Sequence, residues 1–148
     1  MISSAFDWYV QHVLNVAGCV VSTTPEPENA GYGASMANID GQRWRVRTAR
    51  VTPTKAGAFV SVWRRSAGGG TEPFPASEGV HGLLVFVLDQ DRRGLFRFTS
   101  AHLRDLGVAS ADGCSGKRGF RVYPEWSEGL NAQARRTQRA QAAAFSRL

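Results

Sequence analysis

The sequence predicts one mixed α/β (α+β) domain over residues 1–148, with a central mixed sheet of five to six strands flanked by N- and C-terminal helices. Apolar residues recur at helical spacing near both ends of the chain. The dipeptide Asp40-Gly41 separates two strand-like segments and is typical of a hairpin. Residues 83–88 are apolar at every position, which is typical of a central strand covered on both faces.

The spacing of apolar, turn and capping residues predicts each element in order. Ser4 and Asp7 resemble a capping box that begins a helix over residues 4–17, and the aperiodic residues 18–33 are expected to form a loop. A flexible connection is expected at residues 66–79, where three consecutive glycines lie near two prolines. The other predicted elements are strands at 34–39, 42–51, 58–65, 83–88, 94–98 and 119–123, and helices at 100–107 and about 131–147.

Charge is distributed unevenly along the chain. Residues 1–42 contain four acids and no Lys or Arg, whereas residues 43–65 contain seven bases and no acid. Residues 117–148 contain seven bases and two acids, and the net charge of the whole chain is +6. Two basic segments that converge in space would attract polyanions, although a basic composition also serves solubility alone.

Several classes of protein are disfavoured by what the sequence lacks. Its apolar runs are too short to cross a bilayer, so no membrane association is expected. Two cysteines make no disulfide framework, and a cytoplasmic location is expected. The histidines and cysteines lack zinc spacing, so no metal site is predicted. The [DE]-x-K motif of many metal-dependent nucleases is also missing, which makes catalysis doubtful.

Arg50 is the first candidate site residue. Alternation along residues 42–51 places it on the same face as Trp44 and Val46, opposite Arg43 and Arg47. A charged side chain on an apolar face must reach the end of the strand, pair with an acid or contact a ligand. Both an edge pairing and a role in a site remain open for Arg50.

Two segments have the composition of a nucleic-acid surface. Residues 52–57 form a turn with hydroxyls, Lys55 and free N–H groups, which suits an anion but also suits an ordinary turn. Residues 116–126 combine glycines, cations and aromatic rings, which could hold phosphates and stack a base. An ordinary strand with a basic entry explains the second segment equally well. The predicted nucleic-acid-binding residues are Thr54, Lys55, Arg64, Arg65, Lys117, Arg118, Arg121, Tyr123 and Trp126.

The same segments carry a family resemblance. Residues 52–65 (TPTKAGAFVSVWRR), 116–126 (GKRGFRVYPEW) and 133–138 (QARRTQ) resemble the signature runs of MepB-like proteins, and weaker matches begin at Glu28. The resemblance implies an α/β fold similar to restriction-endonuclease and resolvase-like domains, which bind DNA and often cut it. It also implies a lysine where this chain has Arg50, and an aspartate where it has His81-Gly82.

Three hypotheses follow for the function. The first is a nucleic-acid-binding domain, with DNA the expected partner, which binds through a basic cleft and needs no cofactor. The second is a metal-dependent nuclease with Glu28 and Arg50 as weak catalytic candidates, and only this alternative requires Mg²⁺. The third is a regulatory protein whose basic face binds an acidic protein partner.

Overall fold

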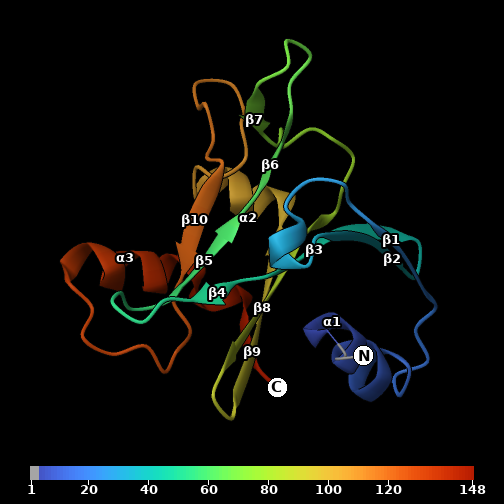
Figure 1. Ribbon diagram of the computed structural model, residues 1–148, viewed down its shortest axis with the longest axis horizontal. Helices are drawn as coiled ribbons and strands as arrows, with labels where there is room; N and C mark the ends of the chain where they lie inside the picture. Colours follow the sequence, from blue (N-terminus) through green and yellow to red (C-terminus); the bar gives the residue numbers. More distant parts are fainter. Residues whose placement is uncertain (1–3) are drawn as a thin grey trace.

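The computed structural model describes residues 4–148, which form a mixed α+β fold around a six-stranded sheet. The strand order is β1-β2-β3-β8-β9-β11, and the central pair β3 and β8 is parallel while the other neighbours are antiparallel. A second sheet has the order β10-β5-β4, and β6 and β7 form a separate two-stranded ribbon. Figure 1 shows the second sheet and α3 on the side of the molecule away from α1.

The six-stranded sheet is built from β1 (Val21–Pro25), β2 (Ser35–Ile39), β3 (Gln42–Thr48), β8 (Gly82–Asp89), β9 (Arg92–Thr99) and β11 (Phe145–Arg147). The other strands are β4 (Arg50–Val51), β5 (Ala58–Ser61), β6 (Trp63–Arg65), β7 (Thr71–Pro73) and β10 (Gly119–Val122). The α-helices are α1 (Ala5–Tyr9), α2 (Ser100–Asp105) and α3 (Ala132–Gln141). A π-helical segment η1 (Val10–Leu14) continues α1, and η2 (Ala30–Tyr32) and η3 (Ala142–Ala144) are 3-10 helices.

Strand β8 has a core on each of its two faces, as its continuous apolar run predicted. Val85 and Val87 pack into a cluster that includes residues of β5 and β10, whereas Leu84 and Phe86 pack into a second cluster with α1. All four side chains are almost completely buried. The central sheet therefore lies between the N-terminal helix on one face and the second sheet on the other.

Most predicted elements form, but some end earlier than expected, the strand predicted over residues 58–65 is divided between β5 and β6, and two segments expected to be loops contain strands. The capping box of Ser4 and Asp7 begins α1, and Asp40 and Gly41 join β2 to β3. Residues 18–33 were expected to be a loop but contain the edge strand β1, and residues 66–79 contain β7. The last helix ends at Gln141 rather than near 147, because residues 145–147 pair with β9 as β11.

The prediction of one strand over residues 42–51 was wrong beyond Thr48. The backbone N–H of Ala49 donates to the carbonyl of Phe86, and the chain then leaves the central sheet for β4 in the second sheet. Arg50 is therefore exposed rather than placed on the apolar face. The buried arginine is Arg47, whose side chain is 0% exposed.

Glu26 neutralises the buried charge of Arg47. Its two carboxylate oxygens accept hydrogen bonds from Arg47 at 2.7 and 3.3 Å, and Arg45 donates to the same carboxylate at 2.9 Å. Arg47 also donates to the carbonyls of Val46 and Ser61. A buried guanidinium is tolerated when a carboxylate and further acceptors satisfy its N–H groups in this way.

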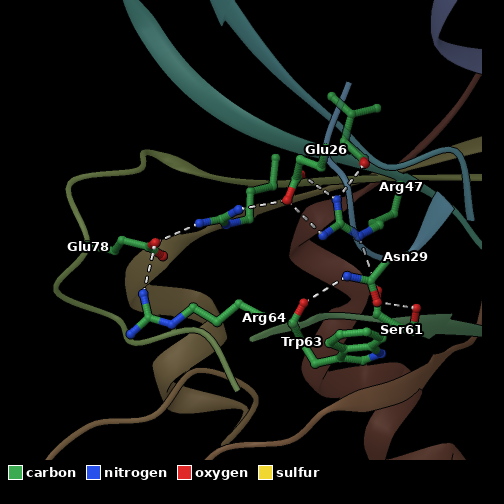
Figure 2. Close-up of polar contacts among 9 residues, drawn as sticks. Glu26, Asn29, Arg47, Ser61, Trp63, Arg64 and Glu78 are labelled. Carbon is green, nitrogen blue, oxygen red and sulfur yellow. Dashed lines mark hydrogen bonds and ion pairs between the residues drawn. The ribbon is translucent and has the colours of Figure 1, made fainter. Parts of the chain in front are cut away.

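This ion pair is the centre of a wider network (Figure 2). Arg45 also pairs with Glu78, and Glu78 pairs with Arg64. Nearby, the buried Asn29 donates from its amide to the carbonyl of Trp63 and accepts from the hydroxyl of Ser61. The network therefore joins the loop after β1 to both sheets and to the β6–β7 ribbon.

Removal of the Glu26 charge should destabilise the fold. Glu26→Gln leaves the guanidinium of Arg47 buried without a carboxylate, so the free energy of unfolding should fall by about 3 to 5 kcal/mol in urea denaturation. Glu125→Gln is the matched control, because Glu125 is 56% exposed and its pair with Arg147 lies on the surface. The control should change stability by less than about 1 kcal/mol. Equal effects of the two substitutions would contradict a structural role for the network.

Candidate nucleic-acid interface

The two long signature segments come together as neighbouring strands. β5 pairs with β10 in antiparallel orientation, with Phe59 opposite Arg121 and Val60 opposite Phe120. Alternation buries Phe120 and Val122 in the core and leaves Arg121 and Tyr123 partly exposed on the other face. Residues about sixty positions apart in sequence therefore contribute to one surface.

The turn over residues 52–57 packs directly against β10. Arg121 donates from its guanidinium to the hydroxyl of Thr52. Gly57 has a φ of +78°, and a Cβ at this position would lie 2.7 Å from both the Val122 carbonyl oxygen and the ring of Tyr123. Glycine is therefore required here both for its backbone conformation and for the close approach to Tyr123.

Helix α3 is attached to β10 by glutamine side chains. Gln141, which is 1% exposed, accepts from the backbone N–H of Tyr123 at 3.0 Å and donates to the carbonyl of Arg121 at 2.8 Å. Gln138 donates to the carbonyl of Pro124 at 2.9 Å. The amide of Gln141 thus satisfies backbone groups of β10 as a neighbouring strand would.

A groove of about 550 Å³ lies between α3, β10 and the end of α2, and we call it the α3 groove. Figure 1 shows α3 beside β10, with α2 behind. The polar residues that line it are Asp105, Lys117, Arg121, Tyr123, Asn131, Gln133, Arg136, Thr137 and Gln141. Its volume is within the range of ligand-binding sites, and its lining is mainly polar.

The α3 groove contains three cations that no acid neutralises. Lys117, Arg121 and Arg136 make no ion pair with a carboxylate of residues 4–148. Asp105 is the one acidic residue in the lining, and its ion pair, at 3.8 Å, is with Arg104 outside the groove. The groove is therefore a region of net positive potential, which favours an anionic ligand.

The predicted binding residues do not form one cluster. Lys117, Arg121 and Tyr123 line the α3 groove, and Lys55 and Trp126 line a neighbouring hollow of about 270 Å³. The three other predicted cations bind groups outside the α3 groove. Arg64 pairs with Glu72 and Glu78, Arg65 pairs with Glu28 at 3.6 Å, and Arg118 donates to the carbonyl and hydroxyl of Thr71. Thr54 is exposed in the turn.

Trp126 is largely occupied by packing. Its ring makes an edge contact with Phe145, with ring centroids 5.6 Å apart, and the guanidinium groups of Arg92 and Arg147 lie 5.3 and 5.4 Å from its centre. Tyr123 is the aromatic side chain of these two that lines the α3 groove. The expected base-stacking role therefore fits Tyr123 better than Trp126.

The two weak catalytic candidates lie in or against the loop after β1. Glu28 pairs with Arg65, and Arg50 donates to the carbonyl of Gly31 at 2.8 and 3.1 Å while its guanidinium lies over the ring of Tyr32. Arg50 is thus held by an edge contact, one of the two arrangements left open by the sequence. In residues 4–148, no three His, Cys, Asp or Glu side chains gather where they could hold a metal ion.

Arg136 was missed as a candidate. The helical spacing of Leu130, Ala134, Gln138, Ala142 and Phe145 predicts an inward row that leaves out Arg135, Arg136 and Arg139, and these three arginines are exposed. The pattern does not say which strand the helix lies against, so it cannot place Arg136 beside Arg121. The sequence offers one signal, the two glutamines Gln138 and Gln141 on the buried side of the same helix. Buried amide side chains need hydrogen-bond partners, which a neighbouring strand can supply.

Replacement of Gln141 should weaken the attachment of α3. Gln141→Leu keeps the side chain's size but leaves the N–H of Tyr123 and the carbonyl of Arg121 without their partners. The free energy of unfolding should fall by about 2 kcal/mol or more in urea denaturation. Gln133→Leu, at an exposed position of the same helix, should change it by no more than about 0.5 kcal/mol. A Gln141→Leu protein as stable as the wild type would contradict the attachment.

Comparison with known proteins confirms the family resemblance that the signature segments predicted. No helix in residues 4–148 is long and apolar enough to cross a membrane. No curated protein matches the chain. The crystal structure of MepB is similar, with a TM-score of 0.83 and 32% sequence identity over 86% of each chain. The MepB-like family model matches residues 26–147, which include both signature strands and α3. The chain therefore belongs to the MepB-like family.

Proposed function

We propose that this protein binds nucleic acid, with DNA the expected partner, through the α3 groove. The observation that carries the proposal is that Lys117, Arg121 and Arg136 line one groove with a single acid, Asp105, and form no ion pair with a carboxylate of residues 4–148. Phosphate groups gain most from cations that have no partner within the protein, because no internal ion pair has to be broken.

The groove also offers the hydrogen-bonding groups that phosphates and bases use. Its lining contains the hydroxyl of Thr137 and the side-chain amides of Asn131 and Gln133. Amide side chains can donate to phosphate oxygens and can also pair with the edges of bases. Most of the basic segment at residues 43–65 contributes little to such a surface, because its arginines are largely paired with glutamates.

The affinity for DNA should fall as the salt concentration rises. This dependence on salt should be weaker in a variant that lacks one groove cation. We expect a dissociation constant of about 10⁻⁴ to 10⁻⁶ M for DNA at physiological salt. Lys117→Ala and Arg136→Ala should each weaken binding and reduce the slope of log K against log salt by about one unit. Both side chains are exposed, so the melting temperature should not change. Fluorescence anisotropy with labelled oligonucleotides at several salt concentrations provides the measurement.

Arg43→Ala is the matched control for charge, because Arg43 is exposed and lies outside the groove lining. It should leave the salt slope nearly unchanged. An absence of binding at low salt would refute the proposed function. An equal loss in the Arg43 variant would mean that net charge, rather than the α3 groove, attracts the ligand.

A further inference from the structure

The cations of the α3 groove lie at two different depths. Lys117 and Arg136 are exposed, whereas Arg121 is partly buried and lies on the β10 wall beside Tyr123. Arg121 and Tyr123 project from the same face of the strand. A ligand that uses all the groove's groups must therefore insert an anionic group as far as Arg121 and bring a flat group to Tyr123.

Duplex DNA cannot make both contacts. Its phosphates lie on the outside of a wide rod and its bases are stacked within, so a duplex laid across the groove would meet mainly the outer cations. A single strand can bend into a groove, present a phosphate to an inner cation and turn a base onto an aromatic side chain. The arrangement of Arg121 beside Tyr123 therefore suits a single strand better than a duplex.

Tyr123 is held in place before any ligand binds. Its ring lies against Gly57, where an added Cβ would be 2.7 Å away, and its backbone N–H is bonded to the buried Gln141. Arg121 is held by the hydroxyl of Thr52 on one side and through its carbonyl by Gln141 on the other. Little side-chain freedom has to be lost when a ligand binds, which favours affinity.

We propose that the α3 groove binds an unpaired, single-stranded segment of nucleic acid, with a phosphate at Arg121 and a base stacked on Tyr123. This proposal rests on the proposed function and narrows its ligand. Lys117, Arg136 and Gln133 also line the groove, so the two cations would bind further phosphates and the Gln133 amide a base edge. Because stacking tolerates every base, the preference is for unpaired structure rather than for a particular sequence.

The test compares four probes on the wild-type protein at one salt concentration. The probes are a single-stranded oligonucleotide, a duplex of the same length, a single-stranded oligonucleotide with abasic sites throughout, and inorganic polyphosphate. The single strand should bind at least about five-fold more tightly than the abasic strand, since stacking of one base contributes at least that factor. It should also bind more tightly than the duplex.

Substitutions of Tyr123 test whether the difference in affinity between the base-bearing and abasic strands arises in the α3 groove. Tyr123→Leu should lower affinity for the base-bearing strand by about five-fold or more and leave affinity for polyphosphate unchanged, whereas Tyr123→Phe should retain both. Arg121→Lys keeps the charge and should retain part of the affinity for all four probes. The comparison of base-bearing and abasic strands uses the wild-type protein. It therefore tests whether bases contribute to binding even if Tyr123→Leu fails to fold.

The outcomes separate this proposal from the one on which it rests. Equal affinity for the base-bearing, abasic and duplex probes would overturn single-strand recognition while leaving polyanion binding intact. No affinity for any of the four probes would overturn the proposed function itself. Loss of polyphosphate binding in a folded Tyr123→Leu protein would show that Tyr123 acts on phosphate or on the shape of the groove, which would also overturn the stacking role.

Discussion

The carboxylate of Glu26 is the group on which the arrangement of the two sheets depends. It lies between Arg45 and Arg47, and Arg47 is enclosed completely by protein. The guanidinium of Arg47 extends from the central sheet to the carbonyl of Ser61 in the second sheet. Without a carboxylate at this point, the position where the sheets meet would hold an uncompensated charge. The short loop that carries Glu26 therefore takes part in the core although it follows an exposed edge strand.

The same network, with two further ion pairs, neutralises most arginines of the basic segment at residues 43–65. Residues 43–65 form the most basic part of the sequence, yet Arg45, Arg47, Arg64 and Arg65 each pair with a glutamate. These glutamates come from residues 26–28 and 72–78, which lie outside the basic segment. Charge counted along the chain therefore overestimates the positive potential near β6. The lining of the α3 groove contains three cations and one acid, Asp105, and none of these three cations forms an ion pair within residues 4–148.

Local patterns predicted much of the fold. Each of the correct predictions rests on a short stretch of sequence. These stretches are the continuous apolar run of β8, the Asp40-Gly41 turn and the capping box at Ser4. Two of the missed strands, β1 and β11, lack a pattern of their own that predicts a strand. β1 is exposed along most of its length and shows no apolar alternation, and β11 continues the helical spacing of α3 although it pairs with β9. The burial of Arg47 is equally invisible in sequence, because its partner Glu26 lies 21 residues earlier.

The glutamines that attach α3 differ from Gln133 and Arg136 of the same helix in what they bond to. Gln138 and Gln141 bond to the backbone of β10 and of Pro124, whereas Gln133 and Arg136 face the groove and make no such bond. Backbone groups are the same whatever side chains β10 carries, so this attachment depends on the two glutamines of α3 and not on the side chains of β10. Substitutions at Gln133 or Arg136 should therefore change the chemistry of the groove wall while the helix keeps its position.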